Sequence, residues 1–237
     1  MIETKQLDYQ VGGKTFHGYI ADGSGGKKVP GILVAHEGGG MTGHPKERAR
    51  MLAEEGYVAF AMDTFGEAIT SREQAMATIG ALMGDLPTLR GRALAALNVV
   101  KAQPNVDASR TGAIGFCFGG TTVLELARSG ADTRCVIGFH SGLTTSAPQD
   151  AANIRCKVMV LLGEADPIIP AAQRQAFIDE MRAGKADWQM HLYGGVGHSF
   201  TNREVDAMGI PGFAYDAAAD RRSWATMKAL FAEAFQG

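Results

Sequence analysis

The hexapeptide GFCFGG at residues 115–120 lies between two stretches of different periodicity. The preceding TGAIGF is a continuous apolar run typical of a buried strand, and the following TTVLELARSG has helical periodicity. Gly115 and Gly119 stand two residues before and after Cys117, which is the spacing of a sharp strand-to-helix turn that exposes a nucleophile. The partial positive charge at the start of a helix favours a thiolate there. The sequence therefore predicts an exposed and reactive Cys117.

Strand and helix signals alternate along the rest of the chain. Buried strands are expected at residues 30–37, 57–63, 111–116, 134–140, 157–164 and 188–195, and helices at 46–56, 86–103, 121–130, 170–183 and 216–235. Two alternating stretches, 4–11 and 14–21, predict an antiparallel hairpin near the N-terminus. Alternating strands and helices indicate an α/β fold with a mostly parallel central sheet and helices on both faces. We expect one domain over residues 1–237.

The composition excludes several classes of protein. The chain has 237 residues and a net charge of −2, without a basic cluster or an acidic tail, so no nucleic-acid partner is expected. No apolar run approaches the length of a membrane span, and MIETKQLDYQVGG lacks the apolar core of a signal peptide. The three cysteines form no CxxC pair, which argues against a disulfide framework or a zinc site. We expect a soluble protein of the reducing cytoplasm.

Four polar residues closely follow predicted strands: Glu37, Cys117, Asp166 and His198. The carboxyl ends of parallel strands meet at one edge of the sheet, so these side chains should lie together. The order nucleophile, acid and histidine along the chain is that of the α/β-hydrolase fold. Cys117 would attack the substrate, His198 would take and return the proton, and Asp166 would orient the imidazole.

An oxyanion hole is expected beside the predicted nucleophile. Its two donors would be the backbone amides of Phe118, directly after Cys117, and of Gly38, in the EGGG loop. Loss of one such donor in a hydrolase costs about 3 kcal/mol of transition-state stabilisation. The backbone at Gly38 is therefore a predicted functional element.

The remaining cysteines, the other histidines and one aspartate are assigned ordinary structural roles. Cys135 and Cys156 begin apolar runs and are expected in the core. Asp63 also ends a strand but precedes Cys117, which breaks the usual order, so we expect it to cap a loop. The histidines expected to be packed or surface residues are His17, His36, His44, His140 and His191.

Four motifs, AHEGGG, GFCFGG, GEADPIIP and GVGHSF, together with SREQA at residues 71–75, are similar to those of one known family. By these motifs the chain resembles the dienelactone hydrolases, cysteine-dependent members of the α/β-hydrolases. The resemblance implies that Cys117, Asp166 and His198 form the catalytic triad. It also implies that Glu37 is the family's carboxylate beside the resting thiol, which pairs with the cysteine or swings away when substrate enters. An acid there is expected to protect the thiol from stray alkylation until substrate arrives.

The family's reference substrate is dienelactone, an unsaturated lactone whose free carboxylate is held by two arginines. By the resemblance, Arg72 corresponds to one of them, although SREQ is also a capping box that begins a helix. The family has the second arginine four residues after the histidine, where this chain has Asn202, and Arg203 follows one place later. Arg72 and Arg203 are the candidate substrate-binding residues, and a neutral ester is as compatible with the sequence as a carboxylated lactone.

These residues predict a hydrolase of small esters or lactones that forms a thioester on Cys117. A neutral phosphotriester is an alternative substrate, because attack on it also places charge on a single oxygen. A third hypothesis is a binding protein or thiol-based sensor, against which the complete triad and the lack of an adjacent resolving cysteine argue. No cofactor or metal is expected, because no metal-ligand spacing occurs and EGGG lacks the lysine of a phosphate loop. The sequence leaves open whether the chain forms a homodimer.

Overall fold

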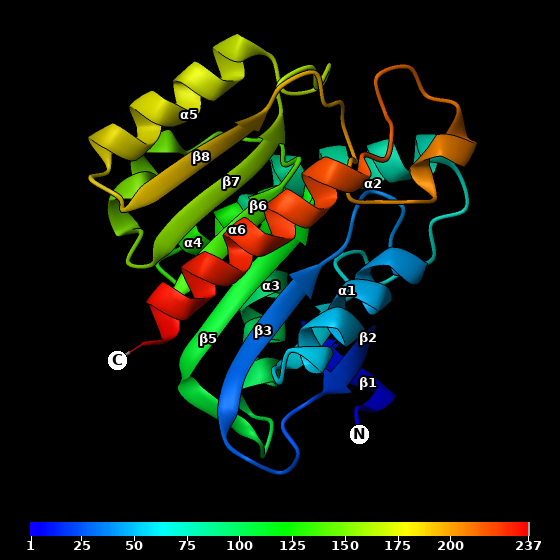
Figure 1. Ribbon diagram of the computed structural model, residues 1–237, viewed down its shortest axis with the longest axis vertical. Coiled ribbons are helices and arrows are strands. Elements are labelled where there is room, and N and C mark those ends of the chain that lie inside the picture. The colour runs from blue at the N-terminus through cyan, green and yellow to red at the C-terminus, as the bar shows by residue number, and fades with distance from the viewer. Residues whose placement is uncertain (237) are drawn as a thin grey trace.

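The protein folds around one eight-stranded sheet (Figure 1). The computed structural model describes residues 1–236. The strands are β1 (Glu3–Val11), β2 (Lys14–Asp22), β3 (Val29–Ala35), β4 (Val58–Met62), β5 (Val106–Phe116), β6 (Cys135–Phe139), β7 (Lys157–Gly163) and β8 (Trp188–Tyr193). The helices are α1 (Gly43–Glu54), α2 (Arg72–Gly84), α3 (Leu86–Lys101), α4 (Phe118–Arg128), α5 (Ala171–Ala183) and α6 (Ala217–Phe235), with short 3₁₀ helices η1 (Pro148–Asn153) and η2 (Val205–Met208).

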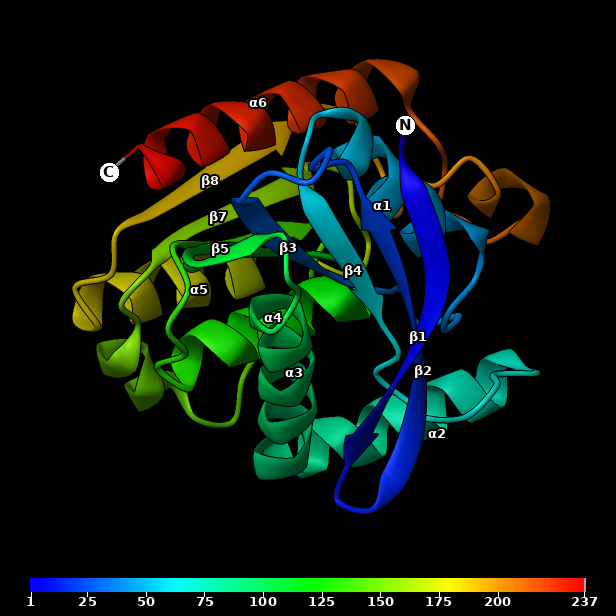
Figure 2. The same cartoon turned by 90° about the horizontal axis from the view of Figure 1, so that it is seen from below.

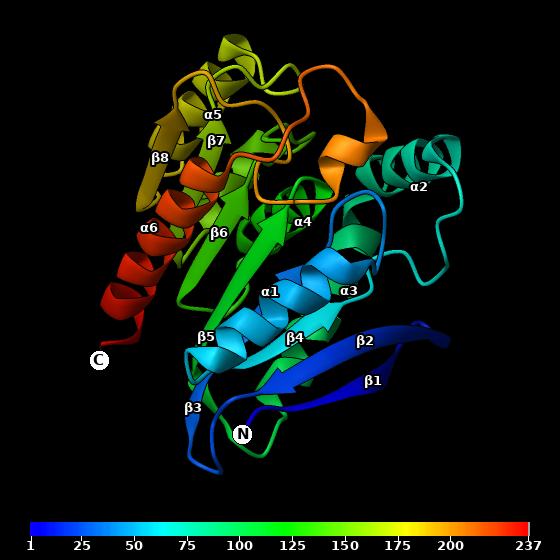
Figure 3. The same cartoon turned by 45° about the vertical axis from the view of Figure 1, so that its right-hand side comes forward.

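The sheet is parallel except at its N-terminal edge. Its strand order is β1-β2-β4-β3-β5-β6-β7-β8, and the pairs β1–β2 and β2–β4 are antiparallel whereas all the others are parallel. Gly12 and Gly13 form the turn between β1 and β2 with φ of 58° and 80°, values that favour glycine. The hairpin forms the edge of the sheet opposite to β8 (Figure 3). The predicted fold class is confirmed, including its antiparallel hairpin.

Helices cover both faces of the sheet and create two separate cores (Figure 2). Successive residues of a strand point to opposite faces. In β3, Leu33 and Ala35 belong to the core that also contains residues of α3, α4 and α5, whereas Ile32 and Val34 belong to the core that contains residues of α1 and α6. All four side chains are fully buried. Because β3 is covered on both faces, its sequence is a continuous apolar run rather than an alternating one.

The turn between β5 and α4 contains two glycines that leave no room for a side chain. A Cβ on Gly115 would lie 2.0 Å from the carbonyl oxygen of Gly119, and a Cβ on Gly119 would lie 2.2 Å from the carbonyl oxygen of Ala35. These contacts fold α4 back onto the end of β5 and hold its first turn against the end of β3. Cys117 lies between the two glycines with φ of 52° and ψ of −116°, outside the regions that side-chain-bearing residues favour. Such backbone strain costs about 1–3 kcal/mol and persists only when the surrounding structure enforces it.

All the predicted strands and helices are present, with shifts at their ends. The helix expected to begin at residue 121 begins at Phe118, because the sharp turn enters it directly after Cys117. For α2 the sequence predicts only a helix start at SREQ and not where the helix ends. Ser71 caps α2 by accepting a hydrogen bond from the amide of Gln74 at 3.1 Å, so SREQ is a helix start. Within residues 1–236, no helix combines the length and the hydropathy needed to cross a bilayer.

We expect Gly115→Ala to lower the free energy of unfolding by roughly 3 kcal/mol, because the added methyl group overlaps the backbone of Gly119 and can be relieved only by displacing α4. Urea unfolding followed by circular dichroism measures this change. Gly91→Ala in α3 is the matched control, since nothing lies within 4 Å of a Cβ there. The free energy of unfolding of that control should rise by about 0.5–1 kcal/mol, because alanine has a higher helix propensity than glycine. Equal stability of the two variants would contradict the steric role of Gly115.

Candidate active site

Asp166 and His198 form a buried hydrogen bond at the carboxyl edge of the sheet. The Nδ1 atom of His198 lies 2.6 Å from Oδ2 of Asp166, and both side chains are buried. The other carboxylate oxygen of Asp166 accepts a hydrogen bond from the amide of Ile168 at 2.8 Å, which fixes the orientation of the carboxylate. The carboxylate therefore keeps a proton on Nδ1 and leaves Nε2 as the atom available for proton transfer.

A second backbone segment holds His198 in place. The amide of His198 donates to the carbonyl of Gly212 at 2.8 Å, and the amide of Ala214 donates to the carbonyl of His198 at 3.2 Å. The ring of Phe213 packs edge-on against the imidazole, with the ring centroids 4.6 Å apart. A Cβ on Gly197 would lie 2.4 Å from the carbonyl oxygen of Gly212, so this close approach requires glycine at residue 197.

Cys117 is half-buried at the N-terminus of α4. Its amide donates both to the carbonyl of Phe139 at 3.0 Å and to Nδ1 of His140 at 3.1 Å. These two acceptors belong to the end of β6, the strand that pairs with β5. These two hydrogen bonds attach the strained turn to the neighbouring strand and so fix the backbone that carries the thiol.

The charges of Cys117 and His198 interact. Burial lowers the pKa of His198, but the nearby charge of Cys117 and the hydrogen bond to Asp166 outweigh it and raise this pKa to about 10. Nε2 of His198 is buried and has no hydrogen-bond partner within the described residues 1–236. An imidazolium with so high a pKa stabilises a thiolate beside it. The structure therefore brings the three residues predicted as a triad into one site.

The predicted oxyanion donors lie at the start of α4 and in the loop after β3. Phe118 is the first residue of α4, where amides have no acceptor within the helix. Gly38 belongs to a turn in which the amide of Gly40 donates to the carbonyl of Glu37 at 3.1 Å. Neither the amide of Phe118 nor that of Gly38 donates a hydrogen bond to any residue between 1 and 236. Their use as oxyanion donors stays a prediction.

Glu37 is largely buried and is bonded to Asn202. The side-chain amide of Asn202 donates to Oε2 of Glu37 at 2.6 Å, while Oε1 is buried without a partner in the described part of the chain. Burial raises the pKa of Glu37, and the hydrogen bond from Asn202 and the charge of His198 offset this only in part. Pairing of Glu37 with Cys117 stays a prediction. No role for Asn202 was predicted from the sequence, although its side chain is the hydrogen-bond donor to the carboxylate of Glu37.

A chain of hydrogen bonds behind Cys117 was not predicted. Because Nδ1 of His140 accepts from the amide of Cys117, Nε2 of His140 carries the proton and donates to Oγ1 of Thr201 at 2.8 Å. Burial lowers the pKa of His140 well below its ordinary range, so the ring stays neutral. Oγ1 of Thr201 lies 3.4 Å from Nε2 of His44, whose Nδ1 lies 3.5 Å from Glu37. The chain of hydrogen bonds from Cys117 ends at His44, because Nδ1 of His44 lies near Glu37 but makes no hydrogen bond within residues 1–236.

The structural roles assigned from sequence are confirmed in part. Asp63 caps its loop by accepting hydrogen bonds from the amides of Phe65 and Gly66 at 3.0 and 2.8 Å. Cys135 and Cys156 are buried in the core, as are His36, His44 and His140, whereas His17 is exposed and His191 is half-buried. Two of the buried histidines nevertheless reach the site. For His140 the signal was its position at the end of a predicted strand, close to the signal that identified the other site residues.

The two predicted substrate arginines have different surroundings. Arg72 is exposed on the first turn of α2. Arg203 lies over the ring of Tyr215, with its guanidinium 5.6 Å from the ring centroid, and lines a cavity that neither Cys117 nor His198 lines. A substrate-binding role for either arginine stays a prediction. Within residues 1–236, no three His, Cys, Asp or Glu side chains cluster as a metal site would require.

The model of the dienelactone hydrolase family matches residues 16–235. The chain belongs to the dienelactone hydrolase family. The solved structure named m3DLH is 42% identical, with a TM-score of 0.95 over 99% of both chains. The dienelactone hydrolase-like promiscuous phosphotriesterase from metagenomic libraries is 41% identical, with a TM-score of 0.94 over 98% of both chains. The carboxymethylenebutenolidase of Pseudomonas putida is 27% identical over 182 residues, which cover 73% of this chain and 75% of that enzyme.

In this member of the dienelactone hydrolase family, Glu37→Gln is expected to increase stability at pH 8 by about 1 kcal/mol, within the usual range of a stabilising substitution. A carboxyl group with a raised pKa binds its proton more tightly in the folded protein than in the unfolded chain. The folded state is therefore destabilised as the pH rises from the ordinary value of 4.5 through the raised pKa. Glutamine removes this cost and still accepts from Asn202.

The difference between Glu37→Gln and wild type should shrink near pH 4, where Glu37 is protonated in both states. Thermal unfolding at the two pH values measures it. Glu67→Gln, an exposed position with the same change of charge, is the control and should behave as wild type. A Glu37→Gln variant that is less stable than wild type at pH 8 would show that the carboxylate stabilises the fold.

His140→Leu should lower the free energy of unfolding by about 2–3 kcal/mol, because it deprives Thr201 of its hydrogen-bond donor and the amide of Cys117 of one acceptor. His140→Asn should recover a good part of this loss. The Oδ1 atom of asparagine can accept from Cys117, and asparagine tolerates the φ of 40° at this residue. Urea unfolding measures both variants. If leucine and asparagine are equally destabilising, the bond to Cys117 is not what holds the turn.

Proposed function

We propose that this protein hydrolyses small neutral esters and lactones through Cys117, His198 and Asp166. The observation that carries the proposal is the 2.6 Å hydrogen bond between Asp166 and His198, whose Nε2 is left without a partner among residues 1–236. The strained turn at Cys117 supports it, because strain of this kind is concentrated at functional sites. Membership of the dienelactone hydrolase family supports the same class of reaction.

The proposed reaction has two halves. The Sγ thiolate of Cys117 attacks the carbonyl carbon, and the oxyanion that forms accepts hydrogen bonds from the amides of Phe118 and Gly38. His198, protonated on Nε2, donates this proton to the leaving oxygen, which departs as an alcohol or, from a lactone, as the other end of the opened ring. A thioester on Cys117 remains.

In the second half, neutral His198 removes a proton from water through Nε2, and the resulting hydroxide attacks the thioester carbonyl. The tetrahedral intermediate breaks the carbon–sulfur bond, which releases the acid and regenerates the thiolate beside the imidazolium. Asp166 stabilises the imidazolium throughout by accepting from Nδ1. These steps need no metal or cofactor.

We assign neutral substrates to the site because, within residues 1–236, neither Arg72 nor Arg203 forms a hydrogen bond or ion pair with a residue of the candidate active site. Asn202, at the position of the family's second arginine, is uncharged and is bonded to Glu37. Arg203 lies over Tyr215, and Arg72 is exposed. The largely buried Glu37, when ionised, would also repel a substrate anion.

Phosphotriester hydrolysis is the second candidate activity. The specific observation in its favour is the 41% identity, over 98% of both chains, to a promiscuous phosphotriesterase of the same family. Attack of Cys117 on phosphorus would place negative charge on one phosphoryl oxygen, which the same two amides would stabilise. Asp166 and His198 would keep the roles they have in ester hydrolysis.

Cys117→Ala is expected to lower kcat by about a thousandfold or more for p-nitrophenyl acetate and for an aryl phosphotriester, because both reactions would lose their nucleophile. Release of p-nitrophenol, followed by absorbance, measures both. Cys156→Ala is the matched control, since this cysteine is buried in the core and burial raises the pKa of its thiol to about 12. That variant should retain nearly all of the activity.

Other outcomes assign the function differently. Residual phosphotriester turnover in Cys117→Ala would place that activity at another site. If wild type turned over neither substrate while Cys117 reacted rapidly with peroxide, the thiol-sensor hypothesis would replace the hydrolase. A carboxylated lactone that is turned over faster than its neutral methyl ester would contradict the assignment of neutral substrates.

A further inference from the structure

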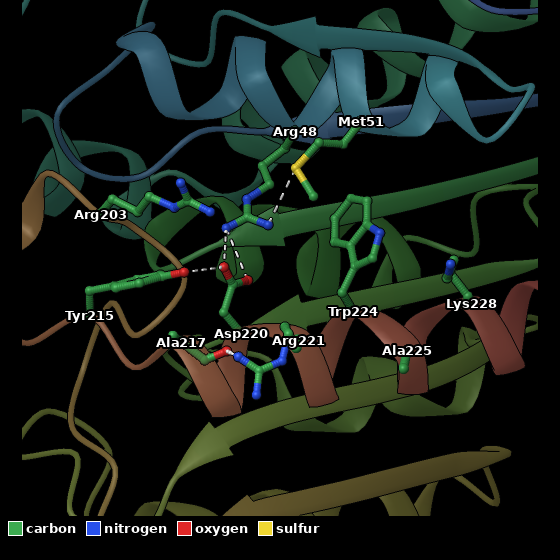
Figure 4. Close-up of a pocket in the computed structure, with 10 residues that line it drawn as sticks. All are labelled: Arg48, Met51, Arg203, Tyr215, Ala217, Asp220, Arg221, Trp224, Ala225 and Lys228. Atoms are coloured by element: carbon green, nitrogen blue, oxygen red, sulfur yellow. Dashed lines mark hydrogen bonds and ion pairs between the residues drawn. The ribbon is translucent and has the colours of Figure 1, made fainter.

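A cavity of about 340 Å³ lies between α1 and α6, outside the candidate active site (Figure 4). None of the predicted triad residues, nor Glu37, lines it. The volume falls at the lower end of the range of small-molecule sites. Its polar and aromatic lining consists of Arg48, Arg203, Arg221, Lys228, Asp220 and Tyr215, together with the indole of Trp224.

The lining carries an excess of positive charge. Four of the residues that line the cavity are basic, whereas Asp220 is the one acid among them. The carboxylate of Asp220 is already engaged, since it lies 3.0 Å from a guanidinium nitrogen of Arg48 and accepts from the hydroxyl of Tyr215 at 3.2 Å. Its charge therefore offsets Arg48 and leaves the remaining cations uncompensated within the cavity.

Arg203 and Arg221 have no carboxylate partner within the described residues. Arg203 lies over the ring of Tyr215, and Arg221 donates to the carbonyl of Ala217 at 3.0 Å on its own helix. Lys228 is bonded to Glu55 at 2.8 Å, at the outer end of the cavity. Two guanidinium groups are thus free to bind an anion, and guanidinium groups bind carboxylates well because the two geometries match.

Arg48 supplies a buried donor inside the cavity. Its side chain is only 4% exposed. Nε donates to His44 at 3.1 Å and Nη2 donates to Asp220, whereas the acceptor for Nη1 within residues 1–236 is the sulfur of Met51 at 3.6 Å. A thioether is a weak acceptor, so Nη1 is poorly satisfied for a buried group. Figure 4 shows the guanidinium of Arg48 between the two helices, close to the ring of Trp224.

We propose that the cavity between α1 and α6 binds a small organic anion with a carboxylate and a flat apolar body. The carboxylate would bind Arg203 and Arg221 at the mouth, and the body would lie on Trp224 and beneath Met51. A ligand whose body carries a polar substituent could also accept a hydrogen bond from Nη1 of Arg48. This proposal does not depend on the proposed function, because neither the predicted triad residues nor Glu37 line the cavity.

Trp224 provides a direct readout of binding. The chain has two tryptophans, and the other, Trp188, lies in β8 against Phe177. In a Trp188→Phe background, titration with benzoate at constant ionic strength should give a saturable change in the fluorescence of Trp224, with a Kd of the order of 1 mM. Benzamide, which has the same shape without the charge, should give no saturable change below about 50 mM, fifty times that Kd.

Charge-removing variants identify the binding site. Replacing both Arg203 and Arg221 by Gln should raise the Kd for benzoate by about tenfold or more. Arg182→Gln, an exposed arginine on α5, is the matched control and should leave the Kd unchanged. Melting temperatures within a few degrees of the background protein confirm that each variant is folded.

Four outcomes would overturn the proposal. The first is no saturable response to benzoate, and the second is an equal response to benzamide. The third is a Kd for benzoate that rises no more in the double variant Arg203→Gln, Arg221→Gln than it does in Arg182→Gln. If the Trp224 emission instead depended on protein concentration without any ligand, the cavity would be covered by a second copy of the chain, and the small-anion proposal would also fail.

Discussion

The close approach of Gly115 to Gly119 determines the geometry of the whole site. Because a Cβ at residue 115 would lie 2.0 Å from a carbonyl oxygen, α4 can turn directly onto β5 only when that residue is glycine. The turn leaves Cys117 with a strained backbone and an amide bonded to the end of β6. The contact of Gly119 with Ala35 then places the first amides of α4 beside the loop that carries Glu37. One steric constraint thus sets the positions of the thiol, the amides and the carboxylate.

Burial shifts the titration of groups around the thiol in opposite directions. It lowers the pKa of His140 and raises that of Glu37, so both favour their neutral forms. His198 is equally buried, yet its pKa is raised because the charge of Cys117 and the hydrogen bond to Asp166 outweigh burial. Positive charge is therefore concentrated on the imidazole next to the thiol. Because His198 and Asp166 are buried, their charge interactions are stronger than those of the same groups at the surface.

Three consecutive residues after the histidine serve different parts of the molecule. Thr201 accepts a hydrogen bond from His140, Asn202 donates one to Glu37, and Arg203 lies over Tyr215 in the cavity between α1 and α6. The uncharged Asn202 gives Glu37 a hydrogen bond without adding a positive charge, whereas the arginine at 203 adds charge to a separate cavity. Neighbouring residues of this segment therefore contact two different parts of the molecule, Glu37 and Tyr215.

From the sequence alone, the fold class and the order and approximate limits of the strands could be predicted. The same holds for the residues at the carboxyl ends of β3, β5, β7 and β8. These follow from local periodicity and from small residues around Cys117, both of which are encoded in short stretches. Three contacts could be recognised only in the folded structure. Asn202 donates to Glu37, His140 and Thr201 support the turn, and Arg203 lies over Tyr215. Such contacts join residues far apart in the chain or depend on the direction of one loop side chain. No local pattern encodes them, since they are set by how the segments pack together.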